Sequence, residues 1–253
     1  TDEHDDIWIG TKRGLNNISQ VELSKESPSF SNYWLEHHFT AAYQLDSMLL
    51  FGTKGDGIKT YESNIKRFDP YPNLFTQLAD KSIMIIESPS KGMLLIGTEH
   101  HGLFVYDLNK NELSVNLLRD KTIRKVYKDA FGEIWLNTLE FGIYRLDSDR
   151  ESFRHYNLTG EDIIITVDDE RQFISEDSKQ NLWIALHGGG LAYYNRPSDR
   201  FEFYRNQSND KTTISSDNVY CITEDQSGML WVGTGIPNGG VNKVYSSNEA
   251  FQQ

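Results

Sequence analysis

The feature that most constrains this chain is a short hairpin pattern that recurs six times along it. In the clearest copy, Gly132 precedes an apolar run at residues 134–138, and Gly142 precedes a second apolar run at residues 143–146. Both runs are too short for helices and are rich in β-branched and aromatic residues, which is typical of strands. The pattern therefore predicts a β-hairpin in each copy.

The six copies recur at a nearly constant interval. Counted from one equivalent residue in each copy, here called the anchor, the steps are 42, 45, 40, 48 and 48 residues. The anchors are Gly10, Gly52, Gly97, Asn137, Ala185 and Gly233. A period of about 40–50 residues in an all-β chain predicts propeller blades of four strands each. We therefore expect an all-β fold, a β-propeller of four-stranded antiparallel blades with about six repeats.

Two further markers complete the expected blade. Sixteen residues after an anchor, an apolar residue begins an outer strand, at Phe68, Leu113, Phe153 and Phe201. An inner strand precedes each anchor, as at residues 83–86 and 219–222, and it ends in a polar turn such as residues 225–228. The expected order is inner strand, Asp-x-x-Gly turn, anchor strand, glycine turn, third strand and outer strand.

The anchor strand reads as a continuous apolar run, which suits a strand buried on both faces. One position in it holds Trp8, Trp135, Trp183 and Trp231 in four copies, with Leu50 and Leu95 in the other two. We expect these side chains to pack neighbouring blades together rather than to stack on a ligand. The single cysteine, Cys221, falls in an inner strand, where we expect it to be buried.

The aspartates that precede the polar turns, Asp129, Asp177 and Asp225, recur at blade ends instead of converging. We expect them to form turns by capping their own backbone, and not to act as paired acid–base catalysts. The acidic run at residues 168–170 is expected in a solvated loop. The glycines at 188–190 serve a hairpin turn, because no helix follows them as in a phosphate-binding loop.

The repeat resembles a known family. Residues 225–234 read Asp-Gln-Ser-Gly-Met-Leu-Trp-Val-Gly-Thr, and with the approach at residues 214–225 they are similar to the two-component regulator propeller repeat. Asn137 and Ala185 depart from the pattern at the anchor glycine, and the copy around Gly52 lacks the aromatic residue. The resemblance extends over almost the whole chain.

This resemblance implies the extracytoplasmic part of a hybrid two-component sensor, hence a periplasmic location. It implies recognition of oligosaccharides released from polysaccharides. It also implies partners outside this chain: another propeller, an immunoglobulin-like domain, a histidine kinase, and a second copy in a homodimer. No catalytic residue and no cofactor are expected in this chain.

Composition excludes some other classes of partner. With 25 basic and 37 acidic residues the net charge is −12, so a nucleic-acid-binding surface is not expected. No apolar run of 18 or more residues is present, so we expect no membrane span. The repeat favours one propeller domain over residues 1–253, with incomplete first and last blades. We expect a fragment of a seven-bladed or double propeller, since open sheet edges are avoided.

Candidate ligand-binding residues lie where loops vary. Strands alternate in direction, so the glycine turns and the loops that enter each inner strand share one side of the blades, and variable loops on a rigid scaffold carry binding residues. Trp34 is the tryptophan outside the repeat and suits stacking on a sugar ring, with covering of a blade edge as the alternative. The other candidates are His37, Lys54, Asp56, His100, His101, Phe141 and His187.

A metal site on the same side is an alternative. The pairs His37-His38 and His100-His101, with Glu36 or Glu99, could offer zinc ligands, but consecutive side chains usually point apart. We therefore expect exposed polar loops and no metal.

Two other functions stay open on the sequence. Some propeller lyases place histidine and glutamate around a metal, and Glu99, His100, Glu140 and His187 would be the candidates here. The third hypothesis is an interaction scaffold whose face docks another propeller. Binding of a glycan without turnover would separate the sensor from the enzyme.

Overall fold

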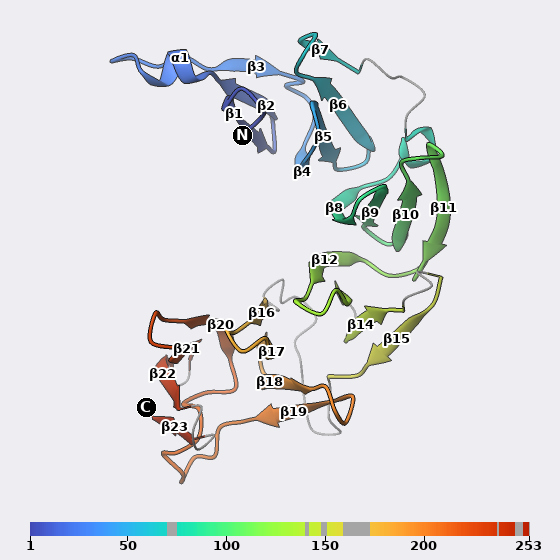
Figure 1. Cartoon of the computed structure of the whole chain (residues 1–253). Coiled ribbons are helices and arrows are strands. Elements are labelled where there is room, and N and C mark those ends of the chain that lie inside the picture. Colours follow the sequence, from blue (N-terminus) through green and yellow to red (C-terminus); the bar gives the residue numbers. More distant parts are fainter. Residues whose placement is uncertain are drawn as a thin grey trace. The chain divides into compact units, whose positions relative to one another are not determined.

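In the computed structural model, residues 1–69, 75–139, 142–147, 151–158, 173–236, 238–245 and 250–252 are described. These residues are almost entirely strands and turns (Figure 1), apart from the four-residue helix α1 (Gln20–Leu23) and the 3-10 helix η1 (Thr76–Leu78). Contacts divide the chain into two compact units, Thr1–Val126 and Tyr127–Gln253. Each unit is described by itself.

Unit 1 contains three sheets, which we call blades 1 to 3. Blade 1 has the order β1-β2-β3, with β1 (Ile7–Thr11), β2 (Gly14–Ile18) and β3 (Ser31–Tyr33). Blade 2 runs through β4 (Phe39–Leu45), β5 (Met48–Thr53), β6 (Ile58–Glu62) and β7 (Arg67–Phe68). Blade 3 runs through β8 (Ile83–Ser90), β9 (Met93–Thr98), β10 (Leu103–Asp107) and β11 (Glu112–Leu117).

Unit 2 contains blades 4 to 6, and the boundary between the units falls within β12. Blade 4 consists of β12 (Ile123–Lys128), β13 (Ile134–Thr138), β14 (Ile143–Leu146) and β15 (Phe153–Tyr156). Blade 5 consists of β16 (Phe173–Glu176), β17 (Leu182–Leu186), β18 (Gly190–Asn195) and β19 (Arg200–Tyr204). Blade 6 consists of β20 (Val219–Glu224), β21 (Leu230–Thr234), β22 (Gly240–Tyr245) and β23 (Ala250–Gln252).

Every blade is a meander in which each strand pairs with the next strand along the chain. The order confirms the expected blade, because the residues predicted to begin the outer strand lie in β7, β11, β15 and β19. Blade 1 has three strands and starts at its anchor strand, β1, as the sequence predicts. The all-β propeller class and its repeating antiparallel blades are therefore confirmed.

Burial of the anchor strands follows from blade packing. Every residue of β9, β13 and β17 is buried, which confirms the expectation from their continuous apolar runs. In β1 and β21 the burial is only partial.

At two anchors, Gly52 and Gly97, the next blade packs directly on the glycine. A Cβ added at Gly52 would lie 2.7 Å from Cγ2 of Ile83, and one at Gly97 would lie 2.8 Å from Cβ of Ile123. Both isoleucines begin the inner strand of the following blade. Close approach of that strand therefore requires glycine at these anchors.

Two of the anchor-strand tryptophans, Trp8 and Trp135, pack against the next blade, as predicted. The ring centroids of Trp8 and Tyr61 are 4.7 Å apart, and those of Trp135 and Tyr194 are also 4.7 Å apart. In each pair the tyrosine comes from the third strand of the following blade. These tilted and edge-on contacts suit the charge distribution of aromatic rings.

The expectation for Cys221 was wrong, because its side chain is exposed. Strand β20 directs Val219 and Ile222 into the core, and its pairing with β21 shifts register between Val219 and Cys221. This irregularity places residue 221 on the uncovered side of the strand.

Candidate functional site

The glycine turns are tied to the loops that lead into the next blade. The N–H of Gly57 donates to the carbonyl of Lys81 at 3.0 Å, and the N–H of Gly102 donates to the carbonyl of Lys121 at 2.8 Å. A Cβ at Gly102 would lie 2.2 Å from the carbonyl oxygen of Leu117, so the backbones touch there. The same bond joins Gly14 to His37 in unit 1 and Gly190 to Asp217 in unit 2.

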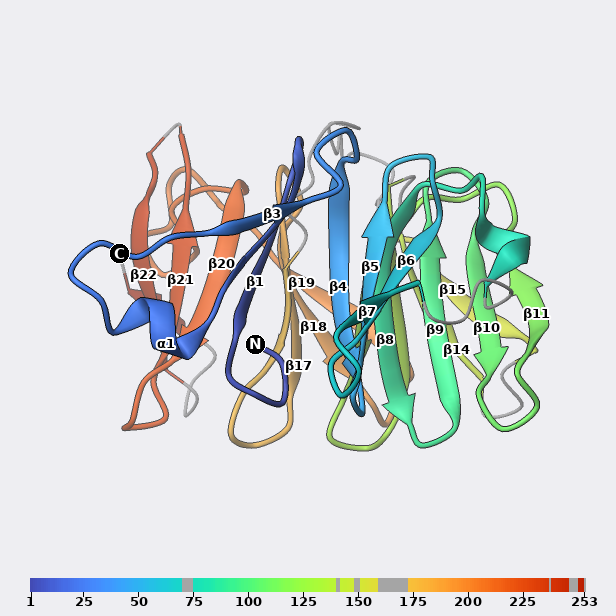
Figure 2. The same ribbon diagram turned by 90° about the horizontal axis from the view of Figure 1, so that it is seen from above.

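Within unit 1 these bonds align three glycine turns and three loops in one continuous band. We call this band the turn strip, and it comprises residues 11–14, 34–38, 53–57, 78–82, 98–102 and 118–122. Bonds within blades extend it, since the N–H of Lys54 donates to the carbonyl of His38 at 2.8 Å and that of Glu99 to the carbonyl of Ser82 at 2.9 Å. Figure 2 shows the β5–β6 and β9–β10 turns together at the upper edge of this unit.

His100 and His101 occupy the tip of the β9–β10 turn and are both exposed. The N–H of His100 donates to Oγ1 of Thr122 at 3.0 Å, and its Nδ1 lies 3.2 Å from the same hydroxyl. Nδ1 of His101 lies 2.8 Å from the carbonyl oxygen of Glu99. The two imidazoles therefore have different hydrogen-bond partners, and both remain exposed to solvent.

An ion pair lies beside these histidines. Nζ of Lys81 is 2.7 Å from Oδ1 of Asp80. The hydrogen bond from Lys81 is the main cause that lowers the pKa of the Asp80 carboxyl, and the charge of nearby His101 acts in the same direction. The loop of residues 78–82 thus connects the turn that carries Lys54 with the turn that carries His101.

Lys54 and Asp56 lie in the β5–β6 turn with exposed side chains. The N–H of Asp56 donates to Oγ1 of Thr53 at 3.1 Å, and the same hydroxyl donates to the carbonyl of Gly57 at 2.8 Å. Thr53 therefore fixes the turn from inside while both charged side chains remain available to a ligand.

Trp34 and His37 precede β4 and are half-buried. The ring of Trp34 lies 4.6 Å from that of Phe68 and 5.9 Å from that of Phe39, so it packs between blades 1 and 2. The N–H of His37 donates to the carbonyl of Trp34 at 3.0 Å, and its buried Nδ1 has no hydrogen-bond partner. Trp34 thus has the packing of a residue that covers a blade edge, and stacking on a ligand stays a prediction.

His187 belongs to unit 2, where it follows β17. Its ring is stacked on Tyr220 with centroids 5.4 Å apart and planes at 15°. Tyr220 also lies against Gly235 of the β21–β22 turn. Tyr220 is not among the residues predicted to bind a ligand, although it lies near the start of an inner strand and beside a glycine turn, where such a residue could be expected.

The structure therefore gathers five candidates, His37, Lys54, Asp56, His100 and His101, on one strip of unit 1. Phe141, and Glu140 of the enzyme hypothesis, lie outside the described residues, as does the acidic run at 168–170. Among the residues that the structure describes, no group of three or more His, Cys, Asp or Glu side chains could hold a metal ion.

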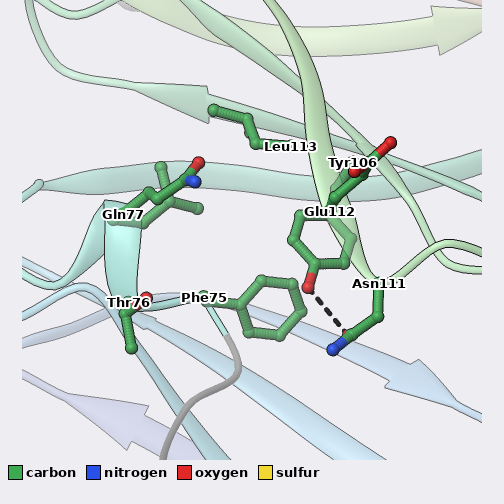
Figure 3. A pocket seen from close by; sticks show the side chains of 8 residues that line it. Phe75, Thr76, Gln77, Tyr106, Asn111, Glu112 and Leu113 are labelled. Atoms are coloured by element: carbon green, nitrogen blue, oxygen red, sulfur yellow. Dashed lines mark hydrogen bonds between the residues drawn. The ribbon is translucent and has the colours of Figure 1, made fainter.

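A separate hollow opens beside the outer strand of blade 3 (Figure 3). Its volume is about 100 Å³, and the residues that line it include Phe75, Gln77, Tyr106 and Leu113. Oη of Tyr106 donates to Oδ1 of Asn111 at 2.8 Å, and burial raises the pKa of this phenol. None of the predicted binding residues lines it.

Comparison with known proteins agrees with this class of fold. The extracellular domain of the hybrid two component system BT3049 from B. thetaiotaomicron is 24% identical with a TM-score of 0.60, over 95% of this chain and 32% of that one. YCF48 bound to D1 peptide has a TM-score of 0.59 at 13% identity, over 99% and 78% of the two chains. Virginiamycin B lyase from Staphylococcus aureus has a TM-score of 0.53 at 15% identity, over 84% and 68%. At these identities the likeness shows a β-propeller fold.

The repeat itself is identified more closely. Residues 213–235 match the family model described as two component regulator propeller, which confirms the predicted resemblance at the segment that carries it. No curated protein matches the chain significantly. The chain spans about a third of the BT3049 extracellular domain. No helix among the described residues is long and apolar enough to cross a membrane.

Proposed function

We propose that this chain is the ligand-sensing propeller of a two-component sensor and that it recognises oligosaccharides in the periplasm. The observation that carries the proposal is the match of residues 213–235 to the two component regulator propeller, in a chain that repeats the same hairpin six times. The similar fold of the BT3049 extracellular domain supports it. Residues 1–253 form one propeller domain in this proposal, with the kinase and the dimer contacts outside them.

The turn strip is the proposed binding surface. It combines exposed cationic, anionic and imidazole side chains. Backbone hydrogen bonds between neighbouring blades hold the turns and loops that carry these side chains. Saccharides bind through hydrogen bonds to such groups and through contact of a ring face with aromatic side chains. Lys54, Asp56, His100 and His101 supply the polar groups, and the exposed part of Trp34 supplies the aromatic edge.

Signalling follows from differential binding. A ligand shifts an equilibrium between two arrangements only by the difference in its affinity for them. The blades hold the strip rigid, so the ligand acts by favouring one arrangement of this propeller and its neighbouring domains. That preference then biases the kinase, and this chain carries out no reaction itself.

The test is calorimetric titration of the chain with a panel of oligosaccharides, alongside assays for new reducing or unsaturated ends. We expect binding to some member of the panel and no turnover of any. The double substitution Lys54→Ala and His101→Ala should weaken that binding, because it removes two exposed groups of the strip. Turnover that is lost with His100→Ala would overturn the sensor in favour of an enzyme.

A further inference from the structure

Histidines are concentrated on one side of the blades. The chain has seven histidines: five lie in glycine turns or in the loops that meet these turns, and the ring of a sixth, in β15, reaches one of the turns. Four are in the turn strip of unit 1, His187 follows β17, and Nε2 of His155 lies against Gly142 in the β13–β14 turn. His4 alone lies at the opposite end of a blade, in the turn before β1. The turn strip lies entirely within unit 1.

The charges of unit 1 are divided in the same way. The turn strip contains six Lys or Arg, five Asp or Glu, and four His, so it is near neutral before any histidine is protonated. The turns at the other ends of its strands, residues 1–6, 19–30, 46–47, 63–66, 91–92 and 108–111, contain seven Asp or Glu and four Lys. In a chain with a net charge of −12, the strip therefore departs from the general acidity.

The exposed cations of the strip are available for a ligand. Lys12, Arg13 and Lys54 are exposed and form no ion pair with a described carboxylate, whereas Lys81 is paired with Asp80. A ligand anion would therefore meet unpaired lysine and arginine side chains without displacing an existing partner.

Each histidine of the strip has identified neighbours. His100 faces the hydroxyl of Thr122, and His101 faces the carbonyl of Glu99 and the Asp80–Lys81 pair. His37 and His38 adjoin the aromatic cluster before β4 and the backbone of Lys54. The charged side chains along these loops and turns are Lys12, Arg13, Glu36, Lys54, Asp56, Asp80, Lys81, Glu99, Arg119, Asp120 and Lys121.

We propose that the turn strip binds an acidic oligosaccharide, one that carries carboxylate or sulfate groups, and binds it more tightly as the pH falls from 7.5 to 5.5. The proposal rests on the proposed function and names the ligand class of the same surface. Histidine is the side chain that gains its charge in this range. Positive charge on the exposed imidazoles of His100 and His101 would add to that of the strip's lysines and arginines, whereas ligand carboxylates that titrate near pH 3–4 stay ionised. Each new imidazolium also becomes a donor at both ring nitrogens.

The experiment titrates the 253-residue chain with trigalacturonate and with the neutral trisaccharide maltotriose, at pH 7.5 and pH 5.5 and at low ionic strength. We expect the affinity for trigalacturonate to rise about tenfold at pH 5.5, because each exposed ion pair contributes only a modest factor. Maltotriose affinity should not change with pH. The gain should also shrink as salt is added, because salt screens exposed charges.

Matched histidine substitutions locate the effect. The double variant His100→Gln and His101→Gln should lose most of the pH-dependent gain, whereas His4→Gln, at the opposite end of blade 1, should keep it. If replacing His100 disturbs the bond to Thr122, the single variant His101→Gln replaces the double variant as the test. Melting curves show whether each variant is folded. Equal affinity for trigalacturonate at both pH values, or equal loss in the His4→Gln variant, would overturn the proposal. If neutral glycans bind and acidic ones bind no better, the acidic-ligand proposal fails while the sensor proposal stands. If neither ligand binds, the result counts against both proposals.

Discussion

The indole Nε1–H of Trp135 donates a hydrogen bond of 2.8 Å to Oδ2 of Asp129, six residues earlier in the chain. The other carboxylate oxygen of Asp129 accepts the N–H groups of Phe131 and Glu133, so one side chain joins the turn to the core. The same indole bond recurs at 2.8–2.9 Å in three further pairs, Asp2 with Trp8, Asp177 with Trp183, and Asp225 with Trp231.

The two blades without this tryptophan also lack the aspartate. Leu50 and Leu95 replace the indole, and Gln44 and Pro89 stand six residues before them. The aspartates form turns as predicted, and their second carboxylate oxygen also accepts a hydrogen bond from the indole N–H. The pair is therefore a unit of two residues that the repeat keeps or loses together.

Replacing Trp135 by phenylalanine should show the value of this bond. The variant keeps an aromatic ring in the core but removes the N–H that Asp129 accepts. We expect a loss of about 1.5–3 kcal/mol in the free energy of unfolding, typical of a buried hydrogen bond to a charged group. Chemical denaturation measures it. Trp231→Phe is the matched control and should cost less than about 1 kcal/mol, because that pair is exposed.

Two glycines with nearly the same φ angle allow the cost of backbone strain to be distinguished from the cost of steric crowding by a Cβ. Gly102 has φ +80 and Gly132 has φ +83, but a Cβ at Gly102 would meet the carbonyl of Leu117 whereas one at Gly132 meets nothing within 4 Å. Gly132→Ala should cost about 1–2 kcal/mol from the left-handed backbone alone. Gly102→Ala should cost clearly more and loosen the bond to Lys121. Equal losses in denaturation would contradict the role of Gly102 in joining blades.

Arg196 holds a group of carboxylates in unit 2. Its guanidinium lies 2.9 Å from Asp129, 2.6 Å from Glu133 and 3.4 Å from Glu176, and its carbon lies 4.0 Å from the ring centroid of Phe131. Arg196→Met should lower stability by about 2–3 kcal/mol at pH 7, since removing one partner leaves charges uncompensated. Chemical denaturation at several pH values would measure this.

The loss should depend on pH in a definite direction. Burial is the first cause that raises the pKa of Glu176, so as pH falls this group takes up its proton more readily in the folded chain than in the unfolded one. The charge of Arg196 lowers this pKa, so Arg196→Met raises it further and the variant gains more stability than the wild type when Glu176 is protonated. The deficit of Arg196→Met should therefore narrow between pH 7 and pH 4.5. Arg200→Met, an exposed substitution in β19, should cost little at either pH. A deficit that grows on acidification would refute this account.

Trp34→Ala tests whether this residue is structural. Its contacts with Phe39 and Phe68 should make the substitution cost about 2–3 kcal/mol, less than for a fully buried aromatic residue. Lys54→Ala should leave stability unchanged because the side chain is exposed. Thermal melts compare the two. A Trp34→Ala chain of unchanged stability but weaker glycan binding would show that the ring serves the ligand and not the core.

Much of the fold could be predicted because its signals are local. Glycine at turns such as Gly102, short apolar strands and a steady period are enough to define hairpins and their order. The side of the blades that carries the glycine turns also follows, because antiparallel strands alternate in direction. The sequence alone therefore predicts Lys54, Asp56, His100 and His101 on one side of the blades.

Other features could not be predicted, because they depend on which segments meet. Arg196 binds Glu133, which is 63 residues away in sequence, and Asp129, which is 67 residues away. No local sequence pattern therefore predicts this cluster of Arg196 and carboxylates. The exposure of Cys221 depends on a register shift between two strands. The stacking of His187 on Tyr220 joins the ends of two blades.

The sequence by itself determined the repeating hairpin, the blade and the residue types presented at each turn, because strand and turn preferences act over a few residues. Only the tertiary structure decided which of those side chains are covered. Trp34 is packed between aromatic rings while Lys54 stays in solvent, and Gly52 and Gly97 are glycines because a neighbouring strand lies under 3 Å from where a Cβ would be. The reason is that burial depends on the approach of one blade to the next, a distance that no single repeat encodes.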